Sequence, residues 1–176
     1  MSKRLLLAAV AVLGIASAAC SEQQPTTQQL HTSRALEFPS LKHVAHEADA
    51  VVEIAVDAAG VVETVGNMPF TVTEARVAGV LKGRDVGRTI RLRQVGSAQG
   101  AGLVPEGELL QAGKRYVAIV VPFTFGDYKP TGQYVVVGGW QGLYRVEGDE
   151  VVATDALRTS LPRRLTRNTF VAAVTS

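Results

Sequence analysis

Cysteine is almost missing from this chain, whose 176 residues contain only Cys20. One cysteine cannot form an intramolecular disulfide, so packing and hydrogen bonds alone must hold the fold together. Aromatic residues make up 6% and charged residues 19%, against 47% hydrophobic residues. These proportions are typical of a folded globular domain and argue against a disordered chain.

The chain also lacks a true excess of either charge. Its formal net charge is +2, but Lys3 and Arg4 lie in the first twenty residues. Without these two, 16 of the 18 basic residues remain, which equals the number of acidic residues. Proteins dedicated to nucleic-acid binding carry a clear basic excess. We therefore expect no nucleic-acid partner.

Motifs for metal binding and covalent catalysis are missing as well. His43 and His46 have a spacing that can bind a metal on a helix, but too few other ligands are near them. Ser97 follows a glycine directly and does not form a G-x-S-x-G elbow. The glycine-rich segment Gly96–Glu108 lacks the G-K-[ST] ending of a phosphate-binding loop, which favours a plain barrel loop.

Paired carboxylates for glycoside chemistry would have to face each other across the fold. The acidic residues that could serve fall in expected loops or turns, where we expect them to face solvent: Glu106, Glu108, Asp127 and Glu147. We accordingly expect no catalytic residues, no metal and no cofactor. An enzyme of another type, acting on cell-wall or envelope material, is the alternative function.

The first twenty residues have the pattern of an export signal. Two basic residues precede the apolar run 5–16, which is shorter than the roughly 20 residues that span a bilayer. Small residues at 17–19 then lead to Cys20. This resembles the lipobox of bacterial lipoproteins, except that Ser17 stands where that family prefers leucine. Ordinary cleavage after Ala18 and an uncleaved anchor are the alternatives.

The resemblance implies lipidation of the Cys20 thiol and attachment through fatty-acyl chains, such as palmitate. It would place the protein on the extracytoplasmic side of the cell membrane or outer membrane. We expect a signal peptide at 1–19, a polar disordered tether at 20–39 and one β-barrel domain at 40–176.

Hydrophobic periodicity predicts short strands between two helices. Helical spacing is expected at 40–48, with Ser40 as N-cap, and again at 166–174. Strands are expected at 50–56, 70–81, 89–95, 116–121, 134–137, 142–146 and 151–153. Because the connections are short and mostly suit antiparallel pairing, the fold class is mainly β. The architecture expected is a small antiparallel OB-like β-barrel with an N-terminal and a C-terminal helix.

Three segments in this order carry a family resemblance: 48–52 (ADAVV), 77–83 (VAGVLKG) and 112–119 (AGKRYVAI). They resemble the netrin-like or tissue-inhibitor-of-metalloproteinase-like module, which has an OB-type barrel. They also resemble uncharacterised bacterial lipoproteins that add the turn at 138–144 (GGWQGLY). The inhibitor's disulfides and free N-terminal cysteine have no counterpart here, so its inhibitory mechanism does not carry over.

Two features are candidate contact sites. Strand 89–95 and its approach hold a basic stripe that could meet anionic lipid or wall polymer: Arg84, Arg88, Arg91 and Arg93. Trp140 lies between glycines, where it either covers the core or contacts a partner. The function expected is a lipid-anchored envelope binding module whose partner is an envelope protein or polymer.

Overall fold

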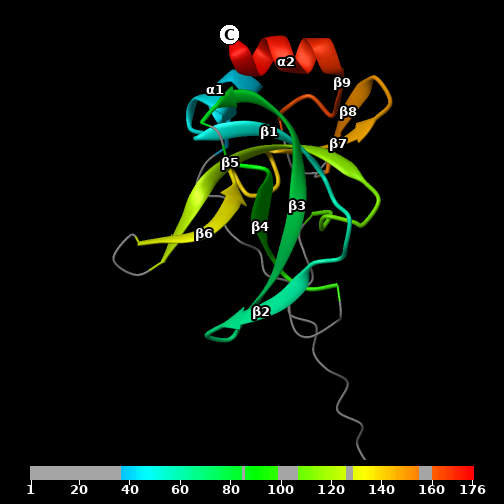
Figure 1. Ribbon diagram of the computed structural model, residues 1–176. Helices are drawn as coiled ribbons and strands as arrows, with labels where there is room; N and C mark the ends of the chain where they lie inside the picture. Colours follow the sequence, from blue (N-terminus) through cyan, green and yellow to red (C-terminus); the bar gives the residue numbers. More distant parts are fainter. Residues whose placement is uncertain (1–36, 85, 99–106, 126–128, 155–159) are drawn as a thin grey trace, which may run out of the picture.

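The structure is a computed structural model that describes residues 37–84, 86–98, 107–125, 129–154 and 160–176. The expected signal peptide, Cys20 and nearly all of the expected tether lie outside the described residues. The described part forms two helices and one sheet of nine strands (Figure 1). The helices are α1 (Leu41–His46) and α2 (Arg167–Thr175). The strands are β1 (Ala50–Ala55), β2 (Val61–Val65), β3 (Met68–Gly83), β4 (Thr89–Val95), β5 (Arg115–Phe125), β6 (Lys129–Val136), β7 (Leu143–Glu147), β8 (Glu150–Ala153) and β9 (Arg164–Thr166).

Five of the strands form a partly closed ring. β1 pairs with β3 and β5, β3 pairs with β4, and β5 pairs with β6, all antiparallel. A single parallel bridge between Leu92 of β4 and Tyr134 of β6 completes the circuit. The prediction of a mainly β, small OB-like barrel is confirmed. The ring is not wholly antiparallel as expected, because β4 and β6 run in the same direction.

Two hydrophobic layers explain which strands are most apolar. Val52 of β1 and Ala118 of β5 face the interior of the ring, among the buried side chains of β4. Their neighbours Val51 and Val117 face the other way and pack against the helices and β7–β8. A strand covered on both faces needs apolar residues at successive positions. This accounts for the continuous apolar run at 116–121, within which the first five residues are fully buried.

Most of the predicted elements are confirmed. The Ser40 hydroxyl caps α1 by accepting a hydrogen bond from the backbone N–H of His43, and Thr166 caps α2 through Thr169 in the same way. The hairpin turn between β7 and β8 pairs Glu147 with Glu150. Its tight geometry needs Gly148, whose φ is 61°.

The sequence did not indicate β2 or β9. β2 has five mostly exposed residues, and β9 has only three, so neither shows a clear alternation. The folded part also begins earlier than Ser40, since Phe38 is buried among the helices and its carbonyl accepts a hydrogen bond from Ser160.

The long strand β3 connects the two ends of the molecule. Its first part pairs with β2 and β4, and its last part pairs with β1. Two register shifts opposite β1 mark irregularities of the kind that bend a strand. As a result the β2–β3 hairpin projects at one end, while α1 and α2 lie at the other (Figure 1).

Candidate functional site

The outer face of β3 and β4 gathers charged and aromatic side chains. Apolar and basic residues alternate along β4, and its apolar residues Ile90 and Leu92 belong to the core inside the ring. Arg91 and Arg93 therefore point to the opposite, outer face. Phe70 and Val72 on β3 pair with residues of β4 and lie on the same side.

Arg93 is buried on this outer face, with 7% of its side chain exposed. Its guanidinium lies 4.8 Å from the ring centroid of Phe70 and 4.8 Å from that of Phe123 on β5. A guanidinium over an aromatic face is stabilised by the ring quadrupole, most strongly where water is excluded. Arg93 is therefore not an openly exposed member of the predicted basic stripe, because phenyl rings from two other strands cover it.

Glu63 of β2 supplies the carboxylate that faces the two arginines. Its Oε2 accepts a hydrogen bond of 2.6 Å from Arg93 Nη2, and its Oε1 accepts one of 3.3 Å from Arg91 Nη2. Gln133 of β6 accepts from Arg93 Nε at 2.5 Å. The Gln133 amide also donates to both Glu63 oxygens at longer distances, 3.5 and 3.4 Å. We call Glu63, Arg91, Arg93 and Gln133 the arginine cluster.

One donor of the arginine cluster is left over. The Nη1 nitrogen of Arg93 is buried and has no hydrogen-bond acceptor among the described residues. Buried polar groups in proteins are almost always paired, and a charged donor without an acceptor is costly. The two N–H groups of Arg93 Nη1 therefore remain available to an acceptor oxygen that can reach them.

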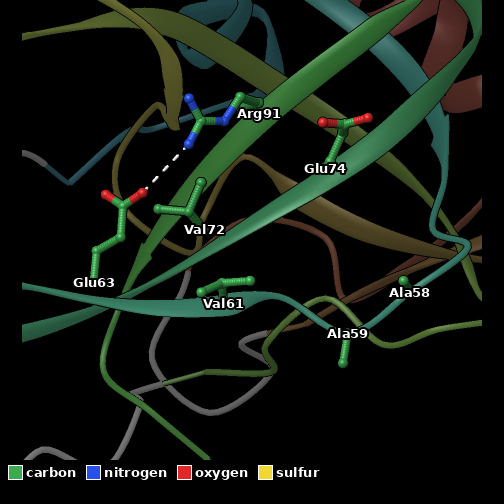
Figure 2. Close-up of a pocket in the computed structure, with 7 residues that line it drawn as sticks. All are labelled: Ala58, Ala59, Val61, Glu63, Val72, Glu74 and Arg91. Atoms are coloured by element: carbon green, nitrogen blue, oxygen red, sulfur yellow. Dashed lines mark hydrogen bonds and ion pairs between the residues drawn. The ribbon is translucent and has the colours of Figure 1, made fainter.

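A small pocket of about 220 Å³ adjoins the Glu63–Arg91 pair. Figure 2 shows the side chains of Glu63 and Arg91 pointing toward each other from β2 and β4. Val61, Val72 and two alanines give the pocket an apolar wall, and Glu74 adds a second carboxylate. The pocket is large enough for a short side chain or a small organic group.

The other predicted contact residues lie apart from the arginine cluster. Arg84 and Arg88 are exposed at the loop between β3 and β4, where Arg88 accepts the Val77 N–H through its backbone carbonyl. Trp140 is buried and belongs to the core inside the ring. Gly107 lies so close to the indole that a Cβ there would be 2.7 Å from Trp140 Cδ2. The structure thus places Trp140 as a cover of the core.

A second charged network runs over β5, β7 and β9. Tyr116 donates a hydrogen bond to Glu108 at 2.8 Å, and Arg145 bonds both Glu108 and Glu147, each at 2.5 Å. Burial and the Glu108 hydrogen bond raise the pKa of Tyr116 above its usual range. The expectation that Glu108 faces solvent is wrong, because Arg145 and Tyr116 hold its carboxylate against the barrel. Residues 99–106 and 126–128 lie outside the described residues, and with them Glu106 and Asp127.

The described residues were predicted to hold no metal, and their histidines bond within α1 and its caps. Within the described ranges, no group of three or more His, Cys, Asp or Glu residues is arranged to hold a metal ion. His43 bonds Ser40 at 2.7 Å, and His46 bonds Glu47 at 3.2 Å. In the same part of the chain, no helix is both long and apolar enough to cross a membrane.

The described part of the chain is thus a small β-barrel whose outer face over β3 and β4 is charged and partly aromatic. No protein-family model matches the chain. No curated protein is significantly similar to it.

Sequence reasoning identified two of the four members of the arginine cluster. Arg91 and Arg93 were visible as alternate residues of one strand. Glu63 and Gln133 lie 30 and 40 residues from Arg93 in the sequence, so their meeting depends on the pairing of strands. The only local signal was that Glu63 stands in a β-prone stretch, after two valines and before Thr64 and Val65.

Proposed function

We propose that this protein is a lipid-anchored envelope lipoprotein whose barrel acts as a binding module. The anchor is the acylated Cys20, and binding takes place on the outer face of β3 and β4. The proposed binding role rests on one observation. The guanidinium of the buried Arg93 lies over two phenyl rings, and its Nη1 has no acceptor among the described residues.

Three features support a binding role over catalysis. The arginine cluster holds two guanidinium groups, which cannot act as a general base. Its carboxylate, Glu63, already accepts hydrogen bonds from both arginines. The equivalent face of many OB-type barrels holds oligonucleotides or oligosaccharides. With a formally neutral mature chain, an envelope polymer or protein is the partner that we favour.

Replacement of Cys20 by alanine tests the anchor. We expect the wild-type protein in the membrane fraction and the Cys20→Ala protein in the soluble fraction, because two or more acyl chains bind a bilayer stably. Mass spectrometry of the mature N-terminus should show acyl chains on residue 20 only in the wild type. Recovery of an unacylated wild-type protein that begins at Ala19 would contradict lipidation.

Replacement of Arg91 by glutamine tests the binding face. The Cys20→Ala protein is mixed with washed envelope fragments from its own cell and sedimented. We expect Arg91→Gln to weaken this association about tenfold, since a hydrogen bond to a charged group contributes about 1.5–3 kcal/mol. The matched control is Lys42→Gln, which removes an exposed charge from α1 at the other end of the molecule. Equal sedimentation of both variants would rule out this face as the binding surface.

A further inference from the structure

The side chain of Glu63 takes the place that a carboxylate ligand could take beside Arg91, Arg93 and Gln133. Its two oxygens face Arg91 and Arg93, and the amide of Gln133 donates to both of them. These donors come from β4 and β6, whereas the carboxylate comes from β2. The donors thus lie on strands of the ring, whereas the acceptor lies on β2 in the projecting β2–β3 hairpin.

The fit of Glu63 to this site is incomplete. A guanidinium binds a carboxylate best with two parallel N–H···O bonds. Glu63 contacts Arg93 through Nη2 alone, and the buried Nη1 has no acceptor among the described residues. The contacts of Glu63 with Arg91 and Gln133 are between 3.3 and 3.5 Å, which is long for charge-assisted bonds. A carboxylate that reached both Nη atoms would satisfy Arg93 better.

The hairpin that carries Glu63 is suited to move away. Within the described part of the chain, β2 pairs with β3 alone. Val61 is 70% exposed, so little apolar burial holds the strand in place. Segments with few buried contacts open at low free-energy cost. Displacement of Glu63 would open these donors toward the pocket beside Arg91, where Val72 of β3 is apolar and Glu74 is acidic.

We propose that Arg91, Arg93 and Gln133 form a receptor for a carboxylate-bearing ligand, and that Glu63 occupies this receptor as an internal competitor. The ligand carries a short apolar group next to its carboxylate, because Val72 of β3 lines the adjoining pocket and stays in place when β2 moves. The proposal rests on the proposed binding function and names its ligand class. A peptide C-terminus and an acidic side chain are two sources of this chemistry.

The test measures binding of small acids to the Cys20→Ala protein by calorimetry, with and without Glu63→Ala. The probes are acetyl-Ala-Ala, with a terminal carboxylate, and the α-amide of acetyl-glutamate, with a side-chain carboxylate. Acetyl-Ala-Ala-amide lacks the charge and serves as control. We expect Glu63→Ala to bind one of the two acids at least tenfold more tightly than the protein with Glu63, and the amide not to bind. The tighter of the two acids identifies the source.

Other results would overturn the proposal. These are equal binding of acid and amide, equal affinity with and without Glu63, or tighter binding of inorganic phosphate than of either acid. Should Glu63→Ala not fold, Glu63→Gln removes the charge and keeps the size of the side chain. In the protein that retains Glu63, the acid should also shift the NMR signal of the Arg93 Nε–H. Envelope sedimentation is scored separately, so loss of the carboxylate result alone leaves the proposed function standing.

Discussion

Replacing Arg115 and Arg167 together with methionine is expected to lower the free energy of unfolding by about 3–5 kcal/mol. Both arginines donate hydrogen bonds to the carboxylate of Glu53. Glu53 lies in β1 between β3 and β5, and only 2% of its side chain is exposed. Without the arginines, this buried carboxylate would lose both of the cations that pair with it among the described residues.

The loss of stability depends on whether Glu53 or the two arginines are replaced. The side chains of Arg115 and Arg167 are 53% and 40% exposed, so water can solvate them when Glu53 is removed. Water cannot solvate the carboxylate of Glu53 in the folded state, because this side chain is buried. We therefore expect Glu53→Leu alone to cost less than the double arginine variant. Adding Glu53→Leu to the double variant should restore most of the lost stability, because no buried charge then remains.

Urea denaturation followed by circular dichroism measures these free energies. The matched control is Lys42→Met, which removes an exposed cation and should change the stability by less than about 0.5 kcal/mol. A triple variant no more stable than the double one would show that the buried carboxylate is not the source of the loss.

Replacing Trp140 by alanine is expected to lower the free energy of unfolding by about 3–5 kcal/mol. The indole is buried in the core inside the ring, and the backbone of Gly107 packs against it. Removing it leaves a cavity that the surrounding strands cannot fill. Because Trp140 is the single tryptophan, the variant must be followed by circular dichroism rather than by fluorescence.

Two further variants make this test specific. Trp140→Phe keeps an aromatic ring in the core and should cost clearly less than Trp140→Ala. Gly107→Ala inserts a methyl group against the indole and should cost about 1–3 kcal/mol through overpacking. If Trp140→Ala were as stable as the wild type, the indole would not be a core residue, and its role as a partner contact would return.

Most of the architecture could be predicted from local patterns. Alternation in 89–95 and the apolar run in 116–121 correspond to strands because each reflects which faces of the chain are covered. Ser40 marked the start of the first helix through its hydroxyl group, whereas the capping role of Thr166 was seen only in the structure. Strands β2 and β9 were not predicted, since a short exposed strand depends on its partner rather than on its own sequence.

The arginine cluster shows where local reasoning ends. The sequence by itself determined that Arg91 and Arg93 share one face of a strand, and that the ring would be mainly β. Only the tertiary structure decided that Arg93 is buried between Phe70 and Phe123 and that Glu63 and Gln133 meet it. Burial and ion pairing across strands are set by register and ring closure, which bring together residues tens of positions apart. The local periodicity of the sequence does not show which of these distant residues will meet.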